Sequence, residues 1–74
     1  MIKYNYIIHS LGDAIKNHHY KEGLALFKLC IEAKTNMKFI VGSLSQQFSF
    51  NKIDTRFMLA QFIKTARYKL THQN

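Results

Sequence analysis

The side chains that could bind a metal or act as acids and bases are few in this 74-residue sequence, and they are scattered. His18 and His19 are adjacent, where two imidazoles do not easily reach one ion, and no cysteine or carboxylate is spaced to complete a tetrahedral set. Ser43, Ser45 and Thr55 have no neighbouring base in the sequence. The four carboxylates belong to different segments and form no acid–base pair: Asp13, Glu22, Glu32 and Asp54. We therefore expect a surface turn at the two histidines, no metal, no cofactor and no enzymatic activity.

Protein recognition is the chemistry that the last third of the sequence favours. The triplets Arg-Phe-Met at 56–58 and Ala-Arg-Tyr at 66–68 place aromatic and Met side chains beside arginines, and these residue types are enriched at protein interfaces. The surrounding basic side chains would steer the chain toward an acidic partner. We predict a partner-binding surface formed by Arg56, Phe57, Met58, Lys64, Arg67 and Tyr68.

The charge balance points to acidic partners in general. Eleven Lys and Arg residues against four Asp and Glu residues give a formal net charge of +7, and such a field attracts polyanions and acidic protein surfaces. The basic residues are spread along the whole chain and form no run. A nucleic-acid footprint and an ordinary solvated surface are therefore both compatible with the composition.

Helices are the elements expected to position these residues. Proline is absent, and the three glycines are isolated inside periodic segments, which argues against a turn-rich β fold. Residues 4–16 carry an apolar stripe at helical spacing, with Asn5, His9, Asp13 and Lys16 on the opposite side. The stripe consists of Tyr4, Ile7, Ile8, Leu11, Ala14 and Ile15. A second helix is expected at residues 20–34, and the short break between the two predicts an antiparallel hairpin.

Two more helices are expected in the second half of the chain, at residues 37–48 and 52–70. Asn36 or Thr35 can cap the first of these, and Asn51 or Ser49 the second. Together the four segments predict an all-α, compact bundle of four short helices arranged as two antiparallel hairpins. The core is expected to consist of Leu11, Ile15, Leu24, Phe27, Ile31, Ile40, Leu44, Phe48, Leu59, Phe62 and Ile63.

The fourth segment has two apolar stripes, which is more than one small domain usually covers. One stripe consists of Leu59, Phe62, Ile63, Ala66 and Leu70, and the other of Ile53, Phe57, Ala60 and Tyr68. The second predicted helix is also apolar on most of its surface. Either the second helix is the central helix of the core, or part of this surface is an interface, and both can hold. We predict a homodimer that packs through the second stripe, with Lys64 at its edge.

The length of the chain is that of one domain, residues 1–74, with a small core of its own. No apolar run approaches the roughly 20 residues that a membrane span needs, and the first residues lack a secretory signal pattern. The single cysteine, Cys30, cannot form an intramolecular disulfide, and its apolar neighbours predict burial. We expect a cytoplasmic protein with no membrane contact.

The run from Asn17 to Ala33, NHHYKEGLALFKLCIEA, resembles the second half of a tetratricopeptide-type helical hairpin. The positions of its pattern are taken by Tyr20, Gly23, Phe27 and Cys30, and Ala14 sits where the first helix would meet them. The resemblance, which covers residues 7–33, implies two helices that approach closely at Gly23 and Cys30. There is no second copy of the repeat, and a solenoid needs about three, so a peptide-binding superhelix is not implied.

Small bacterial regulators of the PerC and ANR (AraC negative regulator) type are similar at this level, being short and helical with such a hairpin. Their characteristic tryptophans are absent from this chain. This resemblance implies control of transcription through contact with another regulator or with a nucleoid protein.

A helix-turn-helix is an alternative interpretation of residues 44–69, with the last helix entering a major groove. Its basic residues would be Lys52, Arg56, Lys64, Arg67 and Lys69. The usual turn glycine is missing, and the helix is more apolar than polar, which suits packing better than reading base edges. We expect a small regulator or inhibitor that docks on another protein, and direct DNA binding is the alternative.

Overall fold

All four expected amphipathic segments are helical in the computed structural model, which describes the backbone of residues 2–72 and the side chains of residues 6–72. The helices are α1 (Ile2–Lys16), α2 (Tyr20–Glu32), α3 (Met37–Phe48) and α4 (Lys52–Thr71). The predicted all-α, four-helix fold is confirmed, and residues 2–72 contain no strand. None of the described helices carries an apolar stretch long enough to cross a membrane.

Asparagine side chains cap α3 and α4, as the sequence predicts. The Asn36 side-chain oxygen accepts a hydrogen bond from the backbone N–H of Lys38 at 2.7 Å. Asn51 accepts one from the N–H of Asp54 at 2.7 Å, and its side-chain amide donates back to the Asp54 carboxylate at 3.1 Å. Each cap satisfies an amide that the first helical turn leaves without a partner.

α1, α2 and α3 each end in a turn of the same type, in which one residue adopts the left-handed conformation. That residue is His18, Lys34 or Ser49, with φ of 58°, 59° and 59° respectively. The N–H of the following residue reaches back to a carbonyl in the last helical turn, for example from His19 to Ala14 at 2.9 Å. This is the Schellman arrangement, for which glycine is the usual residue, and none of the three glycines occupies such a position.

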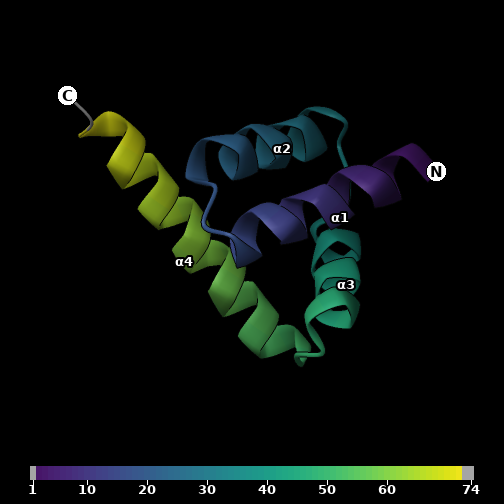
Figure 1. Ribbon diagram of the computed structural model, residues 1–74. Helices are drawn as coiled ribbons and strands as arrows, with labels where there is room; N and C mark the ends of the chain where they lie inside the picture. The colour runs from purple at the N-terminus through teal and green to yellow at the C-terminus, as the bar shows by residue number, and fades with distance from the viewer. Residues whose placement is uncertain (1, 73–74) are drawn as a thin grey trace.

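The helices contact one another in a ring, in which α1 and α4 each pack against both α2 and α3. Figure 1 shows that α2 begins beside α4 and runs away from it, and that α3 and α4 diverge from the turn at residues 49–51. α2 and α3 therefore both rest on α4 without forming a main contact with each other. This arrangement leaves one side of α4 less covered than the others.

Gly23 allows a close approach between helices. A Cβ atom built on it would overlap the ring of Phe62 from α4 and would lie 3.4 Å from the Cβ of Ala14 in α1. Phe62 is also stacked on Tyr20, with ring centroids 5.2 Å apart. The close approach expected at Gly23 is therefore present, and it joins three helices rather than two.

Most of the expected core is buried. Eight of the predicted core residues are buried: Leu11, Ile15, Leu24, Ile40, Leu44, Leu59, Phe62 and Ile63. Phe27 and Phe48 are partly buried and pack against this cluster. Ile8, Val41 and Ala66 are also buried. On the polar side of α1, His9, Asp13 and Lys16 are exposed as expected. The side chains of Asn5 on this side and of Tyr4 on the apolar stripe lie outside the described residues.

The prediction that Ile31 belongs to the core is wrong, because 47% of this residue is exposed. Ile31 lies in the last turn of α2, at the end that points away from α4 (Figure 1). Helical spacing places Ile31 one turn after Phe27, which is correct. In that last turn Cys30 is buried, whereas the side that carries Ile31 is not covered by another helix. The neighbouring Leu29 is exposed to a similar extent.

The interior also contains one polar side chain, Thr55, and the thiol of Cys30. Thr55 is fully buried, and its hydroxyl donates to the carbonyl of Asn51 at 2.8 Å and accepts from the hydroxyl of Ser45 at 3.0 Å. The hydrogen bond between Ser45 and Thr55 ties α3 to α4 near the turn that joins these two helices.

Cys30 is buried as predicted, and desolvation by burial raises the pKa of its thiol above the ordinary value.

Candidate functional site

The outer side of α4 exposes a row of large apolar side chains. Ile53 is 80% exposed, Phe57 67% and Tyr68 63%. With the exposed Ala60 they follow the helical spacing predicted for the second stripe of this segment. We call Ile53, Phe57, Ala60 and Tyr68 the α4 ridge. No helix of the bundle covers it, so the expectation that one domain cannot bury both stripes is confirmed.

A groove of about 630 Å³ lies beside this ridge, between α2, α3 and α4. Its apolar lining is formed by Phe27 of α2, Met37 and Val41 of α3, and Leu59, Ala60 and Ile63 of α4. Three basic side chains of α4 complete the lining: Arg56, Lys64 and Arg67. We call this set of nine residues the basic groove.

The groove and the ridge form one continuous surface around α4. Successive residues of an α-helix are rotated by about 100°, so Ala60 lies between Ile63, which faces the core, and Phe57, which faces outward. Lys64 follows Ala60 by one turn and lines the groove at the side nearer the ridge. A partner seated in the groove could therefore extend onto the ridge without leaving α4.

The structure divides the six predicted partner-binding residues into three groups. Arg56, Lys64 and Arg67 line the basic groove. Phe57 and Tyr68 are on the ridge. Met58 is partly buried and packs against the core, because its position on the helix is turned away from the groove. Met58 is therefore not part of this surface, whereas the other five residues lie on one side of α4.

Three lining residues from other helices were missed by reasoning from the sequence, namely Phe27, Met37 and Val41. Each belongs to an apolar stripe, which predicts burial, and Val41 is indeed buried. Met37 is 37% exposed, because it starts α3 at the open end of the groove. Local spacing carries no signal for this role, since the groove exists only where three helices come together.

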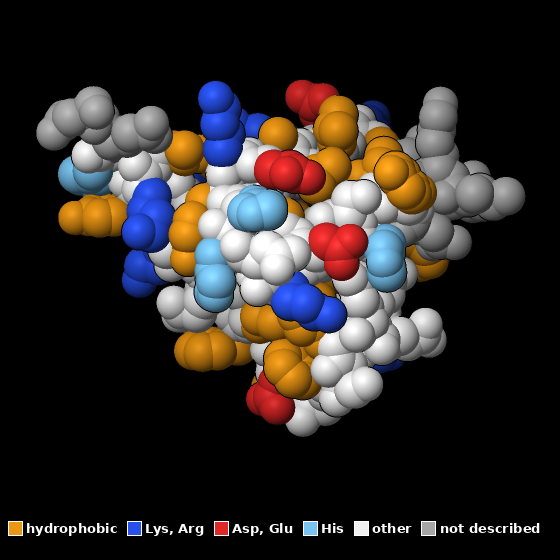
Figure 2. Space-filling view, in the orientation of Figure 1, with side chains coloured by type: hydrophobic (Ala, Val, Ile, Leu, Met, Phe, Trp, Pro, Cys, Tyr) orange, Lys and Arg blue, Asp and Glu red, His pale blue; other side chains and the backbone are white. Residues whose placement is uncertain are grey.

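The carboxylates of the chain lie elsewhere, and none of the four lines the groove. Asp13 accepts a hydrogen bond from Gln47 at 3.3 Å and lies 3.9 Å from the His9 ring, and Glu22 lies 3.9 Å from the His19 ring. Figure 2 shows acidic and histidine side chains interspersed on the face that α1 crosses. Arg56, Lys64 and Arg67 therefore give the groove a positive potential that no acidic lining residue offsets.

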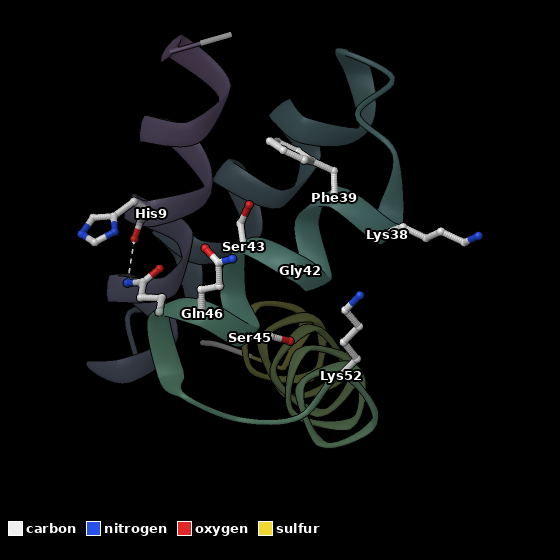
Figure 3. A pocket seen from close by; sticks show the side chains of 9 residues that line it. His9, Lys38, Phe39, Gly42, Ser43, Ser45, Gln46 and Lys52 are labelled. Carbon is white, nitrogen blue, oxygen red and sulfur yellow. Dashed lines mark hydrogen bonds between the residues drawn. The ribbon is translucent and has the colours of Figure 1, made fainter.

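A second hollow runs along the outward side of α3 and is lined by polar and charged residues together with Phe39. Its lining includes His9, Lys38, Gly42, Gln46 and Lys52, with a volume of about 860 Å³. Figure 3 shows that Lys38 extends away from the hollow and that a hydrogen bond links the His9 carbonyl to Gln47, at 3.2 Å. Phe39 is the one large apolar side chain among its lining residues, whereas six apolar residues line the basic groove, so the hollow is the weaker candidate for protein recognition.

The two adjacent histidines and the hydroxyl residues lie outside the basic groove. His18 and His19 are exposed in the turn after α1, as predicted. Within residues 2–72, no three His, Cys, Asp or Glu side chains lie close enough together to hold a metal ion. Ser45 and Thr55 bond to each other, and the hydrogen bonds of Thr55 hold two helices together.

No protein-family model, no curated protein and no solved structure matches this chain. The chemistry and geometry of the α4 surface are therefore what support a function.

Proposed function

We propose that this protein is a small, non-enzymatic regulator or inhibitor that docks on another protein through the exposed side of α4. The proposed partner presents an acidic surface and is a transcription factor or another nucleic-acid-associated protein in the cytoplasm. The contact would combine the α4 ridge with the basic groove beside it.

One observation carries this proposal: the exposed side of α4 places large apolar side chains next to three cations. Ile53, Phe57 and Tyr68 are each exposed over more than half of their surface. Apolar patches of this kind, rimmed by polar residues, mark interaction sites in soluble proteins. Exposed cations at the rim accelerate encounter with an acidic partner, whereas the apolar and aromatic contacts supply most of the binding energy.

The first test is capture of partners from a lysate of the source cells, with and without nuclease. The variant Arg56→Glu/Arg67→Glu should lose the captured protein and keep the helical circular dichroism of the wild type. Lys16→Glu/Lys21→Glu is a matched control, because it reverses two exposed charges on the first hairpin instead. If the control variant loses the partner and the α4 variant keeps it, the docking surface is on the first hairpin and the proposal is wrong.

Comparing the capture with and without nuclease decides between this proposal and direct DNA binding. A partner that survives nuclease is held by protein contacts, whereas one that disappears with the nucleic acid is held through it. A salt series gives a second, independent decision, because phosphate contacts make affinity fall steeply with salt concentration and apolar contacts do not.

A further inference from the structure

We infer that the basic groove binds a single amphipathic α-helix of the partner, with an apolar stripe that enters the groove and acidic residues that flank the stripe. This inference rests on the proposed function and deepens it by naming the element that is recognised.

The dimensions of the groove suit one helix. The cations at its ends, Arg56 and Arg67, are eleven positions apart on α4, which corresponds to about 16 Å, or three turns. A ligand helix lying along α4 would present apolar side chains at i, i+3 or i+4, and i+7 over the same length, which is the usual set of anchors for a helix in a groove. α2 and α3 provide the opposite wall through Phe27, Met37 and Val41.

Backbone hydrogen bonding favours a helix over an extended peptide. The groove is lined by residues of three helices, α2, α3 and α4, whose main-chain groups bond within their own helices. An extended segment would find no strand edge to pair with, and its own backbone N–H and C=O groups would be desolvated without partners. The backbone N–H and C=O groups of a helix are already hydrogen-bonded within the helix, so only its side chains have to match the groove.

Charge determines which helix fits. Arg56, Lys64 and Arg67 line the groove, and no acidic residue does. Glu or Asp side chains beside the apolar stripe of the ligand would face these cations, and Arg is the residue best suited to bind a carboxylate through two parallel bonds. A second copy of this chain is a poor occupant of the groove, because its four acidic residues are divided among three helices and none of these helices presents several carboxylates beside one apolar stripe.

The experiment uses the full chain and a synthetic helix as the probe. The probe is a peptide of about 14 residues, held helical by a lactam bridge, with Leu at i, i+3, i+4 and i+7 and Glu beside them. Its two matched twins carry Lys in place of Glu, or the same residues in an order that destroys the apolar stripe. We expect fluorescence anisotropy to show binding of the acidic amphipathic peptide and at least roughly tenfold weaker binding of both twins.

Variants of the protein locate the binding site. Ala60 is exposed at the groove, so Ala60→Tyr should fill it and weaken binding roughly tenfold or more. Gln61→Tyr is the matched control, since Gln61 is exposed one position further along and does not line the groove; it should bind as the wild type does. Equal binding by Ala60→Tyr and wild type, or equal binding of the acidic and basic peptides, would overturn the inference.

Two other occupants are tested in the same assay. The first is a short DNA duplex. If the duplex binds more tightly than the acidic peptide, and if its binding is weakened by Arg56→Glu/Arg67→Glu but not by Ala60→Tyr, the surface binds phosphate groups and the inference is overturned. A groove filled by a second copy would appear as a concentration-dependent dimer that persists in Phe57→Asp and is lost in Ala60→Tyr, which would also overturn it, whereas a dimer through the ridge is lost in Phe57→Asp.

Failure of this inference can be distinguished from failure of the proposed function. If the acidic peptide does not bind, but a nuclease-resistant partner is still lost in Arg56→Glu/Arg67→Glu, docking through α4 stands and the helix-in-groove mode is wrong. If no partner depends on α4 at all, both are wrong.

Discussion

Gly23 lies where α2 packs against both α1 and α4. Its missing side chain leaves room for the Phe62 ring, which stacks on Tyr20 and closes this corner of the core. Gly42 is different, since a Cβ atom there would meet no atom within 4 Å. Both glycines lie inside helices, where glycine has no intrinsic advantage, and of these two only Gly23 is required by packing.

We predict that Gly23→Ala destabilises the protein by about 1 to 3 kcal/mol, because the added methyl group overlaps a buried aromatic ring. Gly42→Ala is the matched substitution and should stabilise by about 0.5 to 1 kcal/mol, because it removes the conformational freedom of a helical glycine without any clash. Urea denaturation followed by circular dichroism measures both changes.

The double variant Gly23→Ala/Phe62→Leu provides the control for this mechanism. If the clash with the Phe62 ring is the cause, the two substitutions should cost less together than the sum of their separate effects. A neutral effect of Gly23→Ala would mean that α2 and α4 are further apart than the structure places them.

The helices are delimited by two devices, and the sequence makes only one of them visible. The starts of α3 and α4 carry Asn36 and Asn51, whose capping role follows from residue type. The ends of α1, α2 and α3 place His18, Lys34 and Ser49 in the left-handed conformation, which costs a residue with a Cβ about 1 to 2 kcal/mol. The turns therefore form because the packed helices require them.

We predict that glycine at any of these three turn positions raises the free energy of unfolding by about 0.5 to 1 kcal/mol, since glycine adopts positive φ without a steric cost. Thermal denaturation of His18→Gly, Lys34→Gly and Ser49→Gly tests this. Gln46→Gly is the control, because Gln46 is exposed inside α3, and it should lower stability by about 1 kcal/mol. Destabilisation by glycine at all three turns would contradict the left-handed assignment.

For the molecule as a whole, the uncovered ridge and the excess of positive charge act in opposite directions on self-association. Ile53, Phe57 and Tyr68 offer an apolar surface that a second copy could bury. The formal charge of +7 opposes the approach of two copies. Salt screens this repulsion, with a Debye length of about 10 Å at 0.1 M ionic strength. Any dimer formed through the ridge should therefore strengthen as salt is added.

We predict that the protein forms a homodimer through the ridge and that Phe57→Asp converts it into a soluble monomer, because a carboxylate would be buried in the apolar contact. Sedimentation velocity at micromolar concentrations and two salt concentrations measures this. Tyr6→Asp is the matched control, since Tyr6 is an equally exposed aromatic residue on α1, and it should leave the dimer intact. A wild-type protein that stays monomeric at every concentration would contradict the prediction and leave the ridge to a different partner.

The sequence by itself determined the four helices, two of their caps and most of the core. These features depend on residues within a few turns of one another: the stripe that buries Leu11 and Ile15 is a helical period, and Asn51 caps the amide of a residue three positions away. The two apolar sides of the last helix were visible in the same way, since the spacing of Ile53, Phe57 and Ala60 is local.

Only the tertiary structure decided which apolar side each helix hides and where a ligand can enter. From spacing alone, Ile31 was predicted in the core and Met58 on the docking surface, and both predictions are wrong. Spacing also did not indicate that Phe27 and Arg56 line the same groove. All three outcomes depend on how α2, α3 and α4 cross, because a side chain is buried only where another helix reaches it. The path of a helix past its neighbours is set by contacts between residues distant in the chain, such as that of Gly23 with Phe62, and a local pattern does not contain them.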